Sequence, residues 1–595
     1  MHLRRAVAGL GLLPAAVLPS AMHAAAGTPH SPADRVARIE IALRIRHADD
    51  LRHQIEKTSD PSSSSYGHVL SHGLFAARYG ASRHTFSRLT AWLTASGYSD
   101  VAIAADRLFV SASGPSVLPT IPAALAHDVL GVVDTAPDRG FTSHLRQPAP
   151  TRNAERGCRA ARSVGPGDQG RTAFFPGRRG DRYLTLPRIA GAYGLPRAYN
   201  RGYLGRGIEV DVFEAEASFR VDLPTFDRCF GLRTHITYRP IDGGVPDAGG
   251  EVSQQPFVGL ETAVDVETIA SFAPKAHIVV YQGPNSASGI IHTFAAMVQS
   301  DRARIISNSF GGCEDLAPTA LGATFVRSLH QILEQAAAQG QTVTAASGDT
   351  GAEDCAASFG VAGLDPLLNP IDVQAVDFPA SDPNTLAVGG TRLDVDDAGD
   401  RVGEIVWNDG PAGGPTARFA GGGGPSHDFG MSAWQRRTVS GPSNVSDATA
   451  ATGVCPAAAG VCRQVPDVAA NASFATGPIV YWHGEWTDAG GTSAASPEWA
   501  GLLAVANSCA VQHGRRIGFV PPLLYRIARS AHSYREAFLD VTRGNNDYVS
   551  PRRPVIGYSA RRGFDQASGL GAPRNRTFHS GIVGQLCRLA PSSRG

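Results

Sequence analysis

A regular alternation of strand-like and helix-like stretches after Tyr183 constrains the fold more than any other feature. Short runs rich in β-branched and apolar residues predict strands at 208–213, 277–281, 304–307 and 342–346. Before the last of these runs, apolar side chains recur at helical spacing at Phe325, Leu329, Ile332 and Ala336, and Gly340 would end that helix. Strands separated by helices in this way indicate a parallel α/β sheet, whose functional residues lie beyond the carboxyl ends of its strands.

A separate N-terminal unit is expected because 595 residues exceed the size of one ordinary domain. We assign it to residues 31–149 and the main domain to residues 183–595. Within the unit, a helix is predicted from Phe86, Leu89, Trp92 and Leu93, closed by Gly97 and followed by a strand at 108–110. Residues 150–182, rich in Arg and Gly, are typical of an exposed linker that proteases cut, although a plain spacer between domains fits their composition equally well.

Residues 1–26 predict an export signal. Arg4 and Arg5 precede an apolar stretch at 6–18, and Ala24 and Ala26 offer cleavage positions. The apolar stretch is too short to span a bilayer, so we expect a secreted protein, extracellular or periplasmic, with no membrane anchor. Lys and Arg together number 54 and Asp and Glu 53, a balance that argues against a nucleic-acid partner or a polybasic membrane-binding patch.

The chain has eight cysteines and no CxxC pair, which disfavours a structural zinc site. An even number in an exported protein permits disulfides. Cys455 and Cys462 form the easiest local pair, and Cys313 with Cys355 is a second candidate. The remaining pairings stay open.

A candidate nucleophile, Ser493, follows Gly490, Gly491 and Thr492 and precedes an apolar helix. A serine in a tight turn that opens a helix has an exposed hydroxyl, and its own amide lies near the positive helix end, where an oxyanion is stabilised. Alternatively, Ser496 and Pro497 are an ordinary N-cap and first-turn proline. That alternative leaves the glycine pair unexplained.

A serine hydroxyl needs a base. Subtilisins, which share a similar serine motif, use a histidine, but neither His483-Gly484 nor His513-Gly514 continues as theirs does. The sequence Asp349-Thr350-Gly351 also lies in the wrong chain order for a subtilisin. The sequence contains no HExxH motif, so a metallohydrolase is not supported. The base is therefore expected to be a side chain other than histidine.

Glu261 and Asp265 are four residues apart, so a helix would project both carboxyls from one face. Such a pair is destabilising unless it shares a proton, which raises the pKa of one carboxyl and suits a general base at acid pH. The alternative is an exposed helix face on which both carboxylates are hydrated. Asp349, between glycine and threonine at a strand end, is either a turn former or, when protonated, a donor to an oxyanion.

Together these segments resemble the sedolisin, or serine-carboxyl peptidase, family, and the resemblance covers nearly the whole chain after the signal. Further motifs in the family's order are Phe378–Pro383, Val388–Thr391, Trp407, Gly421–Ser426, Trp434-Gln435 and Pro466–Ala472. Several independent motifs in one order make a chance match improbable.

The resemblance implies a subtilisin-like α/β catalytic domain that acts on polypeptide substrates. Ser493 would attack the scissile carbonyl and Glu261 would take its proton. Asp265 would orient Glu261, and Asp349 would donate to the oxyanion. Activity should peak at acid pH, and the choice between endopeptidase and tripeptidyl peptidase stays open. A homologue that binds peptides without cleaving them is the main alternative, although all four positions keep their chemical type.

The resemblance extends to regions outside the catalytic residues. Residues 307–312 resemble the family's substrate-lining strand, which would pair with an extended peptide. Residues 66–111 resemble the pro-kumamolisin-type activation domain, an α/β, ferredoxin-like propeptide that folds with the enzyme and blocks its cleft. The linker would then hold the processing site, and the processed enzyme would be a monomer whose main partner before activation is its own propeptide.

The segments around 539–542 and 563–565 resemble the family's calcium loop. By motif position, one structural Ca²⁺ ion would be held by the Asp540 and Asp565 carboxylates and the carbonyls of Val541, Arg561 and Gly563. Carboxylates and backbone carbonyls are the hard oxygen ligands that Ca²⁺ prefers. The family usually has glycine where this chain has Arg561, and the adjacent positive charges would weaken affinity. The alternative is a surface loop with two ordinary aspartates.

Overall fold

The computed structural model describes residues 37–115, 120–133, 140–143, 158, 171–172, 175–176, 183–245, 258–356, 374–410, 419–439, 461–549 and 554–592. The predicted export signal and most of the predicted linker lie outside these residues, as does Cys455. Within the described residues, no helix is both long and apolar enough to cross a bilayer.

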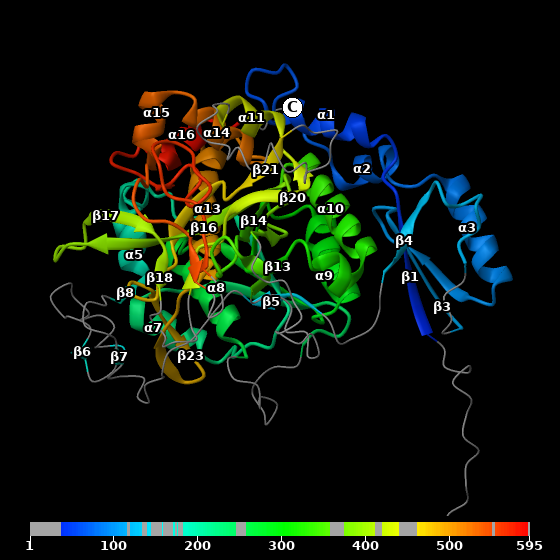
Figure 1. Ribbon diagram of the computed structural model, residues 1–595, viewed down its shortest axis with the longest axis horizontal. Coiled ribbons are helices and arrows are strands. Elements are labelled where there is room, and N and C mark those ends of the chain that lie inside the picture. The colour runs from blue at the N-terminus through cyan, green and yellow to red at the C-terminus, as the bar shows by residue number, and fades with distance from the viewer. Residues whose placement is uncertain are drawn as a thin grey trace, which may run out of the picture.

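The N-terminal unit is an antiparallel sheet with helices against it (Figure 1). Its strands follow the order β2-β3-β1-β4, with bounds β1 (Ala37–Leu43), β2 (Ser99–Ile103), β3 (Phe109–Gly114) and β4 (Val129–Val133). Its helices are α1 (Ala48–Ser59), α2 (His72–Arg78) and α3 (Arg83–Ala95). The Ser82 hydroxyl caps α3 by accepting a hydrogen bond from the Thr85 amide at 3.0 Å, and Phe86, Leu89 and Leu93 are buried. The helix and strand predicted in this unit are therefore confirmed.

A sheet of eight strands forms the centre of the main domain. Its order is β10-β11-β9-β12-β14-β16-β17, with β22 also paired to β16. The strands are β9 (Glu209–Glu214), β10 (His235–Pro240), β11 (His277–Gln282), β12 (Ile305–Asn308), β14 (Thr342–Ala346), β16 (Thr385–Val395), β17 (Arg401–Val406) and β22 (Val468–Asn471). All pairs are parallel except β16 with β17. The four strands predicted from the sequence are β9, β11, β12 and β14, so the α/β parallel-sheet fold is confirmed.

Helices cover both faces of this sheet. Successive residues of a strand point to opposite faces, so Ile278 and Val280 of β11 pack with α8 (Leu260–Phe272) and α13 (Thr492–Gln512). Val279 and Tyr281 of the same strand pack with α9 (Ala287–Ser300) and α10 (Ala323–Ala338). The predicted helix with Phe325 and Leu329 on its apolar face is α10.

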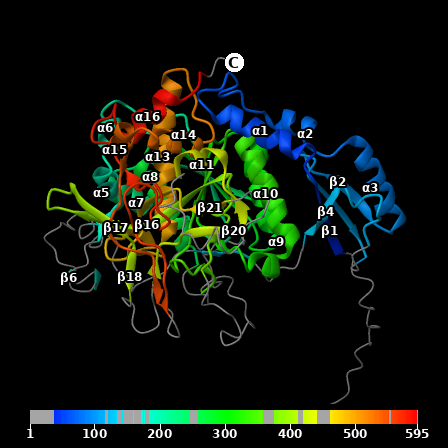
Figure 2. The same cartoon turned by 45° about the horizontal axis from the view of Figure 1, so that its top comes forward.

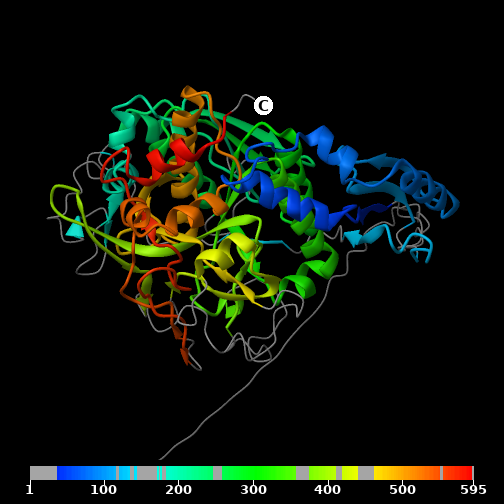
Figure 3. The same cartoon turned by 90° about the horizontal axis from the view of Figure 1, so that it is seen from above.

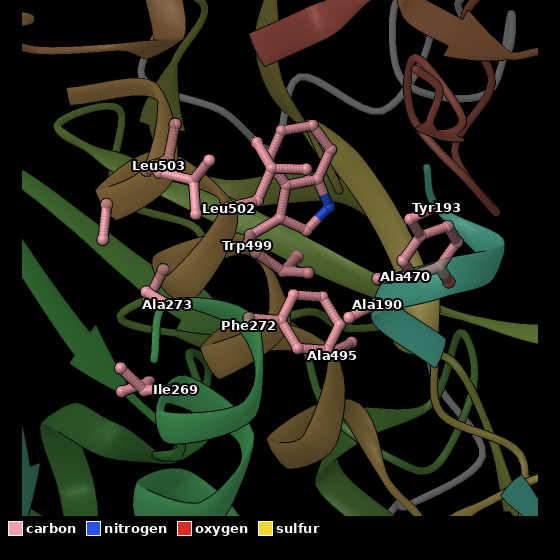
Figure 4. Packing of buried hydrophobic residues seen from close by; sticks show 14 of the residues in the cluster. Ala190, Tyr193, Ile269, Phe272, Ala273, Ala470, Ala495, Trp499, Leu502 and Leu503 are labelled. Carbon is pink, nitrogen blue, oxygen red and sulfur yellow. The ribbon is translucent and has the colours of Figure 1, made fainter. Parts of the chain in front are cut away.

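The helices α8 and α13 pack closely: Phe272 of α8 lies next to Trp499 of α13 (Figure 4), and Ile269 and Leu502 belong to the same buried cluster. Gly501 permits this approach, because a Cβ there would lie 2.5 Å from the Cβ of Phe272. The close packing fixes the two helices that carry the predicted nucleophile and base.

The N-terminal unit docks on the main domain through α1, which lies alongside α10 (Figures 2 and 3). Leu51 and Ile55 of α1 share a buried apolar cluster with α10. The Gln331 amide of α10 accepts from the Ile45 backbone amide and donates to the Leu43 carbonyl, both at 2.9 Å. The docked unit therefore continues the packing of the main domain.

Three disulfides join described cysteines: Cys313–Cys355, Cys158–Cys229 and Cys509–Cys587. The Cys313–Cys355 disulfide confirms one of the two predicted pairs. The other predicted pair, Cys455–Cys462, involves a residue outside the described part of the chain.

Candidate active site

Ser493 is the second residue of α13, directly after the turn at Gly490 and Gly491. The expectation of an exposed hydroxyl is wrong, because Ser493 is fully buried and its hydroxyl donates to the Ser309 carbonyl at 3.2 Å. The alternative helix start at Ser496 is also wrong. Ser496 lies inside α13, where its hydroxyl donates to the Asn308 carbonyl at 3.1 Å.

Pro497 lies within α13 and has a specific consequence for Ser493. A residue at this position would normally donate its amide hydrogen to the carbonyl of residue 493, but proline has no such hydrogen. The Ser309 hydroxyl approaches that carbonyl at 3.3 Å and donates to Asp265 Oδ1 at 2.7 Å. Ser309 therefore links the serine turn to the acidic pair, a contact that the sequence analysis missed.

Glu261 and Asp265 lie in the first and second turns of α8, and both are buried, with 1% and 0% of their surfaces exposed. The alternative of a hydrated helix face is therefore wrong. Burial raises the pKa of Asp265 well above its ordinary value, the hydrogen bond from Ser309 opposes this shift, and the charge of Glu216 adds to it. Asp265 is therefore a carboxyl that keeps its proton at acid pH.

Two further carboxyls complete an acidic cluster that the sequence analysis missed. Glu214 is the last residue of β9 and is fully buried. Burial raises its pKa well above the ordinary value, and the charges of Asp265, Glu216 and Glu261 raise it further. Glu214 ends β9 and Glu216 lies just beyond it, at the edge of a parallel sheet where active sites form, and this position would have indicated both residues.

Asp349 lies in the turn after β14, with 5% of its surface exposed. Its Oδ1 accepts hydrogen bonds from the Thr492 amide at 2.8 Å and the Thr492 hydroxyl at 2.9 Å. The residue before Ser493 therefore holds this carboxyl at the start of α13. A carboxyl at this position is suited to donate a hydrogen bond to an oxyanion formed at Ser493, provided that it carries a proton.

The segment that follows Ser309 is β13 (Phe310–Cys313), which lies between β5 (Thr142–Ser143) and β15 (Asp377–Phe378). Both pairings are antiparallel, and Phe310 is opposite Ser143. The predicted substrate-lining segment, 307–312, thus spans the end of β12 and most of β13. A strand from the end of the N-terminal unit already occupies one of its edges.

The two histidines considered as bases lie elsewhere. His513 follows the last residue of α13, about 30 Å from its first turn at the usual helical rise. His483 follows β23 (Pro478–Trp482), and its ring stacks on Phe219. His513 lies at the far end of α13 and the His483 ring packs on Phe219, so the acidic cluster stays the candidate base.

The five residues predicted to hold calcium come together in one region. The Gly563 amide donates to both Asp540 oxygens, at 3.1 and 3.2 Å, and the Arg561 amide donates to Asp565 at 2.7 Å. Burial raises the pKa of Asp565 to about 6. Among the described residues, no hydrogen-bond donor is directed at the carbonyls of Val541 or Gly563. Two carboxyls and free carbonyls fit the hard oxygen set of a calcium site.

Comparison with known proteins finds similar chains along most of the sequence. The model of the pro-kumamolisin activation domain matches residues 24–117, and that of the subtilase family matches residues 254–516. Kumamolisin of Bacillus sp. (strain MN-32) is 31% identical over 561 residues, covering 91% of this chain and 90% of that protein. Sedolisin of Pseudomonas sp. (strain 101) is 26% identical over 554 residues, covering 91% and 86%.

One solved structure extends the comparison to the fold. Pseudomonas sedolisin, a serine-carboxyl proteinase complexed with two molecules of pseudo-iodotyrostatin, superposes with a TM-score of 0.51 at 26% identity. The match covers 66% of this chain and 96% of the sedolisin chain.

Proposed function

Because the chain belongs to the sedolisin family of serine-type peptidases, we propose that it is a secreted peptidase that works at acid pH and is made as a self-processing zymogen. The contact that carries this proposal is Ser309, whose hydroxyl approaches the Ser493 carbonyl and bonds to Asp265. It places the helix turn that carries Ser493 beside a buried acidic pair, and a serine nucleophile needs a base close to it.

In the proposed mechanism, the Ser493 hydroxyl oxygen bonds to the scissile carbonyl carbon while its proton passes to the Glu261 carboxylate. The carbonyl oxygen becomes an oxyanion that accepts a hydrogen bond from the protonated Asp349 carboxyl. Glu261 then gives the proton to the leaving amine as the carbon–nitrogen bond breaks. Water then loses a proton to Glu261 as its oxygen bonds to the acyl carbon. The bond between that carbon and the Ser493 oxygen breaks, and Glu261 returns the proton to Ser493.

The acid optimum follows from the protonation that this mechanism needs. Burial raises the pKa of Asp265, so at acid pH this residue retains a proton that it shares with Glu261 while Glu261 acts as the base. As pH rises, the shared proton is lost and two negative charges meet on one helix face. Activity should therefore be present at acid pH and decline towards neutrality.

The zymogen proposal is supported by β5, which pairs with β13 beside Ser309. An extended substrate would use the same backbone hydrogen-bonding edge. While β5 remains there and Ser493 stays buried, a substrate has no access. Removal of the N-terminal unit should therefore be needed for activity.

Acid activation tests this proposal. Purified full-length protein moved from neutral pH to about pH 4, near ordinary carboxyl pKa values, should lose a fragment that ends within residues 150–182. It should then digest denatured protein, and mass spectrometry with a gel assay follows both events. A chain that stays intact at acid pH, and remains inert after residues 1–182 are removed by an added protease, would contradict the proposal.

We also propose that one Ca²⁺ ion is held by the carboxylates of Asp540 and Asp565 and the carbonyls of Val541, Arg561 and Gly563. The ion would stabilise the C-terminal loops by neutralising the partly buried Asp540 carboxylate and the buried Asp565 carboxylate. Asp565 would have to bind in its ionised form, although burial raises its pKa to about 6. Affinity for calcium should therefore weaken as pH falls below this value.

Chelation is expected to lower thermal stability. Calcium at 100 times its dissociation constant adds about 2.7 kcal/mol, so EDTA at pH 6 should lower the melting temperature by about 3–5 °C. Asp565→Asn should melt at the lower temperature with or without EDTA. As a matched control, Asp547→Asn alters a nearby carboxyl outside the set and should keep the EDTA response. A wild-type melting curve that does not respond to EDTA or added calcium would rule out the ion.

A further inference from the structure

The first turn of α8, which carries Glu261, has no cap of its own. The residue at its N-cap is Gly259, with φ of 78° and no side chain to accept a hydrogen bond. The first amides of any helix lack partners within that helix and need acceptors from elsewhere. The base of the proposed mechanism therefore lies on a helix end whose order depends on another segment.

Glu216 supplies that acceptor. Its Oε1 accepts a hydrogen bond from the Glu261 backbone amide at 3.0 Å, and the amides of Gly259 and Thr262 also bond to its carboxyl. One side chain from the loop after β9 thus satisfies three amides at the start of α8. This is the role that an N-cap residue normally plays within its own helix.

The Glu216 backbone is itself anchored. Its carbonyl accepts a hydrogen bond from Gln282 Nε2 at 3.2 Å, and Gln282 is a buried residue at the end of β11. The following loop passes closely over the helix start, because a Cβ at Gly259 would lie 2.9 Å from the Ala217 carbonyl oxygen. The carboxyl is therefore tied through its own backbone to the central sheet.

We propose that Glu216 is a positioning residue of the peptidase, which fixes the first turn of α8 and thereby the place of Glu261. This inference rests on the proposed function, since it concerns the base assigned there. Glu216 acts through Glu261 and takes no proton from Ser493. A displacement of a catalytic group by about 1 Å can lower a rate by about 100-fold, so the anchor is expected to affect turnover.

The charge state of Glu216 determines how the test is designed. Burial raises its pKa to about 8, and the hydrogen bonds from the helix amides lower it only in part. At acid pH its carboxyl is therefore neutral and adds no charge beside Glu214, Glu261 and Asp265. A neutral amide of the same length should replace it, whereas a shorter carboxyl should not.

Three variants distinguish the effect of the length of the Glu216 side chain, its reach to the helix, from the effect of its charge. Glu216→Ala and Glu216→Asp should each lower kcat at about pH 4 by about 10- to 100-fold with KM little changed. Glu216→Gln should restore kcat to within about threefold of wild type, because its amide oxygen still reaches the helix. If Glu216→Gln loses as much activity as Glu216→Ala while Glu216→Asp is active, charge matters rather than reach and the proposal is overturned. Equal kcat in all four enzymes would overturn it as well.

A second measurement does not depend on activity. In the Ser493→Ala full-length protein, Glu216→Ala should increase hydrogen exchange of the Glu261 and Thr262 amides by about fivefold to tenfold, and Glu216→Gln should not. Unchanged exchange in Glu216→Ala would overturn the positioning role even if the enzyme proves to be a peptidase. If exchange is faster in Glu216→Ala but the wild-type chain fails the acid-activation test, Glu216 anchors the helix and the proposed peptidase function is wrong.

Discussion

Replacement of Ser493 by alanine is expected to abolish acid processing and to lower kcat for peptide hydrolysis by a factor of about 10⁶, the loss seen when a serine nucleophile is removed. The effect should be chemical rather than structural. Among the described residues, the Ser493 hydroxyl makes one hydrogen bond, to the Ser309 carbonyl, so its loss should leave the packing of α8 and α13 unchanged. Full-length Ser493→Ala should therefore remain folded, uncut and inert at about pH 4.

Ser496→Ala is the matched control. It removes another buried hydroxyl from the same helix, one that bonds to the Asn308 carbonyl and Thr344. It should lower stability by about 1 kcal/mol and still process itself. Melting temperature, chain mass and hydrolysis of a peptide substrate after acid treatment distinguish the two variants. Autoprocessing of purified Ser493→Ala at the wild-type rate would show that another group is the nucleophile.

The main fold could be predicted because its signals are local. Strand β14 matches its predicted bounds, 342–346, since a short apolar run between a helix and a turn is recognisable from neighbouring residues alone. The apolar spacing of α10 is equally explicit, as Phe325, Leu329, Ile332 and Ala336 are all fully buried. These elements alternate because a parallel sheet requires a crossover between successive strands. The alternation can therefore be recognised in a single sequence.

The start of α13 was less predictable because two local rules conflicted there. Ser496 and Pro497 are favourable residues for the first turn of a helix, yet α13 begins earlier, at Thr492. The hydrogen bond that Pro497 cannot make is replaced by the approach of Ser309 from a different strand. Tertiary contacts therefore allow α13 to begin at Thr492, although the residue preferences of Ser496 and Pro497 favour a later start.

The acidic cluster depends on tertiary structure still more. The sequence motifs indicated Glu261 and Asp265, but Glu214 comes from β9, Glu216 from the loop after it, and Ser309 from a third segment. Their chemistry arises only when burial removes the carboxyls from water, which is why the exposed-face alternative could not be rejected from spacing alone. A single sequence indicates the residue types of such a site, whereas the fold determines how many carboxyls share it.

Glu261→Gln is expected to lower kcat by a factor of about 10⁴ to 10⁶, the range seen when the base or its partner is removed from a serine peptidase. The amide has the size of the carboxyl, and the Glu261 backbone amide would still bond to Glu216. The amide cannot accept the Ser493 proton at any pH, so the loss should persist across the whole pH profile. A variant that was merely destabilised would instead recover under its most stabilising conditions.

The matched control for this variant is Glu267→Gln, on the same helix. Burial raises the pKa of Glu267 well above its ordinary value, so the carboxyl is neutral at acid pH and an amide should replace it. Its Oε2 accepts a hydrogen bond from the Tyr481 amide at 2.9 Å, which the amide oxygen of glutamine can also accept. Glu267→Gln should therefore keep kcat within about threefold at about pH 4, since neither form is charged there. If Glu261→Gln were as active as Glu267→Gln, Glu261 could not be the base, and Asp265 or Glu214 would have to take its place.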